Sequence, residues 1–253
     1  MEQAGIKIRA VIFDIYTTIL EVGPPPANAD ALWKNLFQEL LGHPPAVGRT
    51  EFFIRTSRVV ARLHAEARSR GIPWPEIQWP SVVREVIPGL ACLPPDKLDD
   101  FLLRQMQIGR TLRLADGAAE CLRQLNDNGI LLGIASNSQA YTLRELNAAL
   151  QAVGLNLSLF DRDLRFWSFE HGFSKPDPHV FRILTARLEA RGISPSETLM
   201  VGDRLDNDIE PAKVHGWQTW QLQPAAKGDW TGLRDWLLHP EPGSELKRLS
   251  SPL

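Results

Sequence analysis

Three short apolar runs in this chain each end at a polar side chain: VIFD (residues 11–14), ILLGIAS (130–136) and LMVGD (199–203). Their branched aliphatic residues are typical of strands that are buried on both faces of a sheet. From about residue 112 onward, such runs alternate with stretches of helical periodicity. This alternation predicts an α/β fold, a doubly wound parallel sheet with helices on both faces.

The expected elements of this Rossmann-like core follow one another along the chain. The first expected strand lies in the run from Arg9 to Leu20 and ends at Asp14. The later elements are read from apolar runs and from helical spacing bounded by Gly, Asn and Pro. Strands are expected at 130–135, 198–201 and 217–222, and helices at 117–126, 141–152, 178–190, 209–215 and 230–238.

Residues 22–108 interrupt the alternation, because no strand pattern is found between Glu21 and Gly109. Apolar residues there recur with helical spacing, and Thr50 is a candidate N-cap for the longest helix. Helices are expected at 32–41, 50–71, 82–87 and 98–108. The sequence therefore predicts an all-helical cap domain inserted into the core. The predicted division is core over 1–21, helical cap over 22–108, core over 109–239 and a loose tail over 240–253.

Composition narrows the range of functions. The chain has 253 residues and a formal net charge of -2, a balance that argues against a nucleic-acid partner or a polybasic membrane partner. Cys92 and Cys121 are too few for a disulfide framework or a thiolate metal site. Asp14 interrupts the first apolar run, so no signal peptide is expected, and no stretch approaches the length of a membrane span. We expect a cytoplasmic protein that acts on a small molecule. The oligomeric state is not indicated.

Polar side chains are expected to meet at one edge of the sheet, because ligands of doubly wound folds bind outside the carboxyl ends of the strands. A carboxylate there can attack phosphorus and form an acyl phosphate. Magnesium, held by oxygen ligands, offsets the repulsion between the carboxylate and the phosphate, while a lysine and a hydroxyl bind the equatorial oxygens. The chain supplies this set with Asp14, Ser136 and Asn137, Lys175 in FSKPDP, and Asp203 and Asp208 in VGDRLDND.

In this order, the four segments resemble the four motifs of the haloacid dehalogenase superfamily of hydrolases, and residues 22–108 resemble its helical cap of the first type. The core resemblance covers Arg9–Leu20 and about residues 112–222. It implies that Asp14 is the nucleophile and that the Thr18 hydroxyl supports the loop and the phosphoryl group. It also implies that Ser136 binds a phosphoryl oxygen and that Lys175 pairs with the nucleophile and the phosphate.

The resemblance also implies a magnesium site. Its ligands would be Asp14, the backbone carbonyl of Tyr16 and Asp203, with Asp208 as a second ligand or as the group that orients metal-bound water. Taken singly, Asp203 and Asp208 are also explained as acids at the start of a helix, where they interact well with the helix dipole.

Tyr16 and Thr17 depart from the pattern, because most phosphatases of the superfamily carry Asp and Gly there. Tyr16 removes the carboxylate that usually protonates the leaving oxygen and then activates water. A tyrosine at this position resembles the 2-haloacid dehalogenases, which attack carbon and use no metal. Those enzymes, however, have Ser in place of Asp203 and Tyr in place of Phe181.

Retention of both acids in VGDRLDND favours a cation, because unpaired carboxylates facing Asp14 would repel one another. The sequence therefore favours a magnesium-dependent phosphatase over a metal-independent 2-haloacid dehalogenase-like hydrolase. A third hypothesis is a catalytically weak family member that binds a ligand.

Specificity would depend on the cap, where Arg55 is a candidate for binding a substrate phosphate or carboxylate, although a solvated cationic face is the more common role of such a residue. Ser136, Asn137 and Lys175 complete the expected substrate-binding set.

Overall fold

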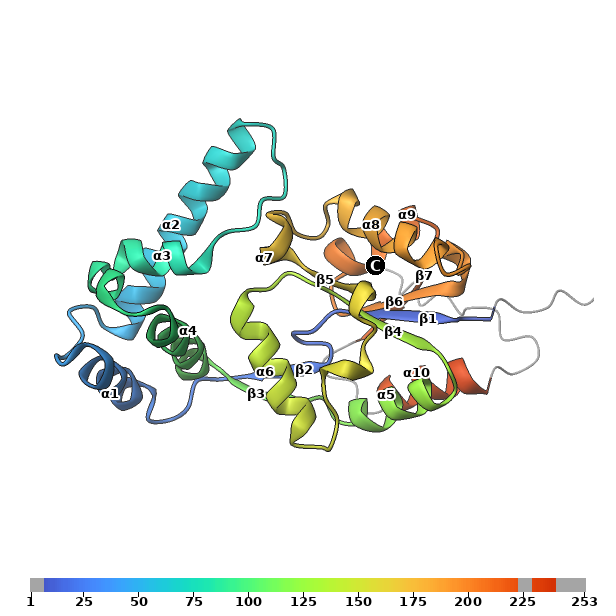
Figure 1. Cartoon of the computed structure of the whole chain (residues 1–253), viewed down its shortest axis with the longest axis horizontal. Coiled ribbons are helices and arrows are strands. Elements are labelled where there is room, and N and C mark those ends of the chain that lie inside the picture. The colour runs from blue at the N-terminus through green and yellow to red at the C-terminus, as the bar shows by residue number, and fades with distance from the viewer. Residues whose placement is uncertain (1–6, 223–228, 240–253) are drawn as a thin grey trace, which may run out of the picture.

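A computed structural model describes residues 7–222 and 229–239. The strand β1 (Ala10–Phe13) lies in the middle of a five-stranded sheet of order β5-β4-β1-β6-β7, in which all neighbouring strands are parallel (Figure 1). The other strands are β4 (Leu131–Ser136), β5 (Arg165–Trp167), β6 (Thr198–Gly202) and β7 (Gln218–Gln221). The predicted α/β fold class is confirmed.

The two faces of the sheet have separate hydrophobic cores, because successive side chains of a strand point to opposite faces. Val11 and Phe13 belong to the cluster that includes residues of α5 (Ala118–Asp127) and α10 (Asp229–Leu238). Ala10 and Ile12 belong to the opposite cluster, which includes residues of α8 (Pro178–Glu189). All four side chains of β1 are fully buried, as expected for the central strand.

The remaining core helices connect these strands. The longer ones are α6 (Ala140–Gln151), α7 (Ser168–His171) and α9 (Glu210–Val214), and a π-helical turn, η5 (Leu205–Ile209), precedes α9. Short 3-10 turns are η2 (Leu157–Leu159), η3 (Arg162–Leu164) and η4 (Pro195–Glu197). The strand β5 and the helix α7 were not expected from the sequence, since each is only three or four residues long.

One expectation about the strands is wrong. No strand was expected between Glu21 and Gly109, yet a turn after β1 leads into a second strand, β2 (Leu20–Gly23), which pairs antiparallel with β3 (Thr111–Leu114). These strands are short and partly exposed, so no long apolar run marks them. Glu21 and Arg113 lie opposite each other in the ladder and form an ion pair. This two-stranded ribbon connects the helical insert to the core (Figure 1).

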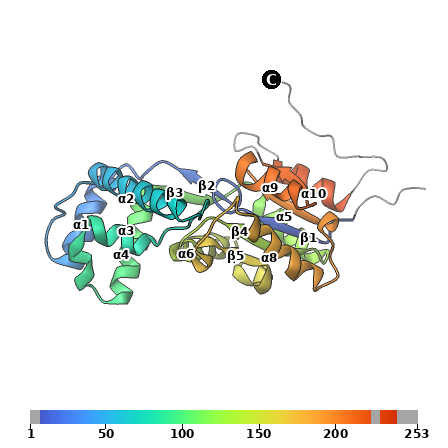
Figure 2. The same cartoon turned by 90° about the horizontal axis from the view of Figure 1, so that it is seen from above.

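The helical insert packs around its own aromatic core, beside the sheet (Figure 2). Trp33, Phe37, Phe52 and Phe101 form a chain of ring contacts with centroids 4.9 to 6.2 Å apart. The insert comprises α1 (Ala29–Leu41), α2 (Arg49–Ser69), α3 (Trp79–Val86), the 3-10 turn η1 (Pro88–Cys92) and α4 (Pro95–Gly109). Its helical character agrees with the expectation for the cap.

The ends of the cap helices differ slightly from the expected ones. Gly42 adopts a left-handed conformation with φ 75° and ends α1, as its position in the sequence suggests. Thr50 is not the N-cap of α2, because Gly48 holds that position and Arg49 begins the helix. A serine- or threonine-type cap is therefore absent there, and the predicted cap interaction is wrong.

A loop between α2 and α3 fastens the cap to the core, and we call residues 73–78 the docking loop. Pro75 forms a β-bridge with Phe173, and the Glu76 amide donates to the Gly172 carbonyl at 3.0 Å. The cap is thus attached at the ribbon and again at this loop. The expected tail 240–253 lies outside the described residues. Within 7–222 and 229–239, no helix has the length and apolar character that a membrane span requires.

Candidate active site

Asp14 directly follows β1 and forms the centre of a buried ionic cluster. The Lys175 Nζ donates to Asp14 Oδ1 at 2.8 Å and to Asp208 Oδ1 at 2.5 Å, and the Lys175 side chain is only 1% exposed. Burial raises the pKa of Asp14 to about 6, against the lowering effect of Lys175 and with a further raising effect of Asp208. The two carboxylates hold the pKa of Lys175 above its usual value in spite of burial. The lysine is therefore an ammonium ion that pairs with the candidate nucleophile.

Asp208 is held by its own loop. Its Oδ2 accepts from the Arg204 backbone amide at 3.1 Å, and its side chain is 1% exposed. Gly202, at the end of β6, is required for this arrangement, because a Cβ atom there would collide with the Asp208 carboxylate. The sequence VGDRLDND thus brings two acids to Asp14 from one strand end, Asp203 immediately after β6 and Asp208 one turn later.

Asp14, Asp203 and Asp208 together meet the geometric requirement of a metal site. One carboxylate oxygen from each lies within 4.8 Å of the others. Three carboxylates and the one ammonium ion of Lys175 leave the cluster with an excess of negative charge when all are ionised. A small hard cation such as Mg²⁺ prefers carboxylate and carbonyl oxygens, so the donor set fits it.

Thr17 connects two of the oxygens that the sequence assigns to the metal. Its hydroxyl lies 2.5 Å from Asp203 Oδ2 and 2.6 Å from the Tyr16 carbonyl oxygen. Among the described residues other than glycine, Thr17 is the one with a positive φ, at 60°. Left-handed backbone is unfavourable for a β-branched residue, and the glycine usual at this position would carry no such cost.

Two buried hydroxyls have no hydrogen-bond partner among the described residues: Ser136 Oγ at the end of β4 and Thr18 Oγ1 in the loop after β1. Buried polar atoms of this kind are costly unless something binds them. Both are therefore suited to bind an oxygen of a ligand.

Asn137 is hydrogen-bonded to the backbone of Lys175. Its amide oxygen accepts from the Lys175 backbone N–H at 2.7 Å, and its amide nitrogen donates to the Lys175 carbonyl at 2.9 Å. With both ends of its side chain bound to the backbone of Lys175, Asn137 positions the lysine. Its expected contact with a substrate stays a prediction.

The Tyr16 side chain belongs to a second cluster, next to the cap. Its hydroxyl donates to Glu145 Oε2 at 2.5 Å and lies 2.8 Å from Thr142 Oγ1. The Arg110 guanidinium lies over the Tyr16 ring at 4.2 Å and pairs with Glu145 at 2.8 Å. Burial, together with the nearby Glu145 carboxylate, raises the pKa of Tyr16 above its usual value in spite of Arg110. The phenol is thus a neutral donor tied to Glu145.

Sequence reasoning missed Arg110, Thr142 and Glu145. Arg110 directly follows the last cap helix, and the other two lie on the first turns of α6, the helix after Ser136. Their places next to the cap boundary and to a motif strand were visible in the sequence, but no spacing or motif connects them with Tyr16.

Arg55 is not brought to the site. It lies on α2, half exposed, and its guanidinium pairs with Glu51 one turn earlier at 2.7 Å. No contact between Arg55 and the ionic cluster is found in the described part of the chain. The structure thus favours the solvated-face interpretation of this arginine.

Comparison with known proteins agrees with this geometry. The family model of haloacid dehalogenase-like hydrolases matches residues 8–216. The chain belongs to this family. As a haloacid dehalogenase-like hydrolase, it carries its aspartate cluster at the expected edge of the sheet.

Two relatives that are similar in sequence carry the names of phosphatases. A ribulose-1,5-bisphosphate 5-phosphatase of Halopiger xanaduensis is 33% identical over 124 residues, which are 49% of this chain and 48% of the relative. A glyceraldehyde 3-phosphate phosphatase of Pyrococcus furiosus is 33% identical over 108 residues, 43% of this chain and 41% of the relative. The chain therefore spans about half the length of these relatives.

Among solved structures, a 2-haloacid dehalogenase from Pseudomonas syringae pv. Tomato DC3000 superimposes with a TM-score of 0.57 at 20% identity. The match covers 87% of this hydrolase and 88% of the dehalogenase. At this identity the likeness concerns the fold.

Proposed function

We propose that this hydrolase is a magnesium-dependent phosphatase of small phosphorylated metabolites, acting through an aspartyl phosphate at Asp14. The observation that carries the proposal is a cluster of three carboxylates with oxygens within 4.8 Å of one another, two of which pair with a buried lysine. Such a cluster binds a divalent cation and, through it and the lysine, a phosphate dianion. The two phosphatase names among the relatives support the same reaction class.

In the first step, an Asp14 carboxylate oxygen attacks phosphorus, the bond between phosphorus and the ester oxygen breaks, and the leaving alkoxide takes a proton from water and departs as the alcohol. Lys175 and the Ser136 hydroxyl bind the phosphoryl oxygens where charge accumulates, and Thr18 supports the loop. Asn137 keeps Lys175 in place for this task through its two backbone hydrogen bonds. Magnesium, when bound by Asp14, the Tyr16 carbonyl and Asp203, with Asp208 nearby, supplies charge neutralisation.

In the second step, water attacks the phosphorus of the aspartyl phosphate, Asp14 leaves as a carboxylate, and phosphate and a proton are released. A general base would normally take this proton and is worth about a hundred- to ten-thousand-fold in rate. The Tyr16 phenol is neutral, has a raised pKa, and donates a hydrogen bond to Glu145. We infer that solvent must accept the proton and that this step limits turnover.

The alternative is carbon–halogen hydrolysis without a metal. It is favoured by Tyr16, the residue type of the 2-haloacid dehalogenases at this position. Asp203 opposes it, because a serine in the dehalogenases removes the negative charge that this chain keeps next to Asp14. The fold likeness to a dehalogenase does not distinguish the two reactions.

A substrate screen tests the proposal. Phosphorylated metabolites and short 2-haloacids are offered to the full chain, each with magnesium and with a chelator, and phosphate or halide release is measured. We expect phosphate release that stops on chelation and that Asp14→Asn abolishes. Halide release that is unaffected by chelation would establish the dehalogenase instead. Magnesium and phosphate binding without any release would indicate a ligand-binding member of the family.

A further inference from the structure

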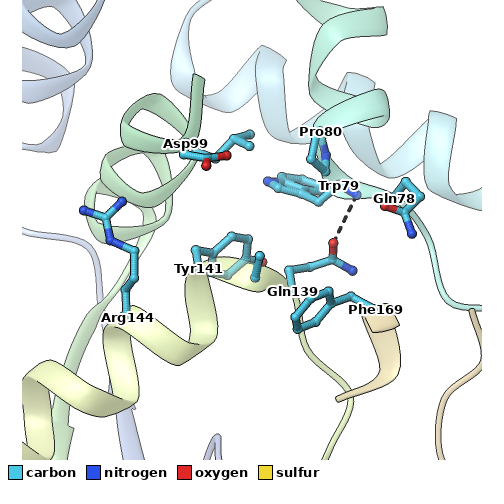
Figure 3. A pocket seen from close by; sticks show the side chains of 10 residues that line it. Gln78, Trp79, Pro80, Asp99, Gln139, Tyr141, Arg144 and Phe169 are labelled. Carbon is cyan, nitrogen blue, oxygen red and sulfur yellow. Dashed lines mark hydrogen bonds between the residues drawn. The ribbon is translucent and has the colours of Figure 1, made fainter. Parts of the chain in front are cut away.

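A cavity of about 210 Å³ lies between the cap and the core (Figure 3). Its core wall is formed by Gln139 and Tyr141 at the start of α6 and by Phe169 of α7. These elements follow β4 and β5, and Ser136 and Trp167, the last residues of those strands, are partners in the sheet. The cavity therefore opens along the same carboxyl edge as Ser136, on the side away from Asp203.

The cap wall of the cavity is fixed to the core wall by Gln139, whose side chain is largely buried. Its amide oxygen accepts from the Trp79 backbone N–H at 3.1 Å, and its amide nitrogen donates to the Ile77 carbonyl at 2.9 Å and to Glu76 at 3.0 Å. Glu76 in turn accepts from Ser168 at 2.5 Å. The two walls are therefore held at a set separation before any ligand binds.

Three of the ten lining residues are aromatic. The rings of Trp79, Tyr141 and Phe169 surround the space in Figure 3. The Trp79 ring is held in place by its indole N–H, which donates to Gln105 at 3.2 Å, and by an edge contact with Phe52. Rings that are held in this way can stack on, or meet edge-on, a further ring of a ligand.

The volume of the cavity limits the size of the ligand group that it can hold. An apolar cavity of about 150 Å³ holds one benzene ring, so this one suits a single ring with a substituent. Asp99 and Arg144 lie at its rim. Within the described residues, neither side chain has a hydrogen bond or an ion pair, so both are available to polar substituents of a ligand that protrude from the cavity.

We propose that this cavity is the leaving-group pocket of the phosphatase, and that it selects phosphate esters whose alcohol carries one aromatic or heteroaromatic ring. The inference rests on the proposed function, because it takes the phosphoryl group to lie at Ser136 and Lys175. The ring then lies between Trp79, Tyr141 and Phe169, and a polar substituent of the ring meets Arg144 or Asp99.

Binding of non-hydrolysable phosphonates tests this proposal apart from catalysis. Benzylphosphonate and propylphosphonate are titrated into the full chain with magnesium, and affinities are measured by calorimetry. Both carry the same phosphonate head, so any difference reports the ring. Burial of one ring is worth about tenfold or more in affinity, and we expect benzylphosphonate to bind at least that much more tightly.

Two variants locate the ring. Phe169→Ala removes one wall and is expected to reduce the preference to about twofold or less. Ala140→Phe fills the cavity from the exposed first residue of α6, where a larger side chain disturbs packing least. This variant is expected to lose the preference for the ring while it still binds propylphosphonate. Trp74→Ala is the matched control, because Trp74 lies in the same docking loop, is 42% exposed and does not line this cavity. It is expected to leave the preference unchanged.

The outcomes separate the two proposals. Equal affinities for the two phosphonates in the wild type, or a preference that survives Ala140→Phe, would overturn the pocket assignment and leave the phosphatase proposal intact. Failure of both phosphonates to bind, with magnesium present, would overturn the phosphatase proposal and the pocket with it.

Discussion

Asp14 and Tyr16 are two residues apart, yet their side chains belong to two clusters that differ in their balance of charge. The sheet-edge cluster, formed by Asp14, Lys175, Asp203 and Asp208, has more negative than positive charge when its three carboxylates are ionised. The hinge cluster, formed by Tyr16, Arg110, Thr142 and Glu145, pairs its one guanidinium with its one carboxylate.

This difference separates binding from support. A site with uncompensated charge is stabilised by the ligand that brings the missing charge, whereas a site with matched charges stabilises the fold by itself. Arg110 follows the last cap helix and Glu145 lies on a core helix, so the hinge cluster joins cap to core. Tyr16 stands at the position that usually transfers protons in this family, and here its side chain contributes to the contact between the cap and the core.

The largest expected effect is that of Asp14→Asn on activity. The amide is isosteric with the carboxylate but a far poorer nucleophile, so we expect kcat to fall by about a thousandfold or more. Phosphate release on the best substrate of the screen measures it. Residual activity near that of the wild type would place the nucleophile elsewhere.

The next effect concerns the metal. Asp203→Asn removes one charged ligand of the proposed site and is expected to weaken magnesium binding by about tenfold or more in calorimetry. The matched control is Asp206→Asn in the same loop, because Asp206 is exposed and pairs with Arg204. Equal losses in both variants would mean that the loop as a whole, rather than the Asp203 carboxylate, determines the affinity.

The hinge cluster should respond in the opposite way. Tyr16→Phe removes the donor to Glu145, whose side chain is 2% exposed, and leaves a buried carboxylate oxygen without that bond. We expect the free energy of unfolding to fall by about 1–3 kcal/mol while kcat changes by about threefold or less. Thermal or urea unfolding and a turnover assay measure the two quantities. A large loss of kcat with unchanged stability would show that the phenol takes part in the chemistry.

The effect of Asp14→Asn on stability should depend on pH. Since the pKa of Asp14 is about 6 when folded and 3.8 in its ordinary state, the folded chain binds the proton more tightly and loses stability as pH rises from about 4 to about 6. The amide has no such loss. The variant should therefore have a higher Tm than the wild type above pH 6, by several degrees, because each kcal/mol shifts Tm by about 2–4 °C in a protein of this size. The difference should vanish below pH 4.

The smallest expected effect is that of Thr17→Gly. The change removes a hydroxyl that occupies Asp203 Oδ2 and the Tyr16 carbonyl oxygen, and it relieves the left-handed backbone of a threonine. Both oxygens become available to a cation, and we expect magnesium to bind about threefold more tightly. Thr17→Ser keeps the hydroxyl and is expected to bind magnesium like the wild type. Weaker binding in the glycine variant would mean that the hydroxyl helps the metal.

Part of the sheet-edge cluster could be predicted because Asp14 and Asp203 each directly follow a buried apolar strand. Once the strands are parallel, Asp14, Ser136 and Asp203 must come to the same edge. The sequence also indicates the helical insert, through helical spacing and the Gly and Pro residues that end its helices. These features are local or follow from topology.

The hinge cluster could not be predicted, because it depends on how α6 lies against the cap boundary. Arg110 and Glu145 are 35 positions apart and show no periodic relation. Similarly, β2 and β3 are held by a ladder between distant segments, and neither has an apolar run of its own. The Arg55 guanidinium is held at the helix surface by its neighbour Glu51, and the positions of the arginines in the sequence do not indicate this pairing.

The central claim is that Asp14 is phosphorylated readily and dephosphorylated slowly, because Tyr16 is committed to Glu145. A rapid-mixing measurement of leaving-group release from p-nitrophenyl phosphate, with magnesium and with the protein at known concentration, tests this most directly. We predict a burst that approaches one leaving group per chain, followed by a slow linear phase, with no burst in Asp14→Asn. Linear release from the first turnover onward, or a burst of equal size in Asp14→Asn, would contradict the account.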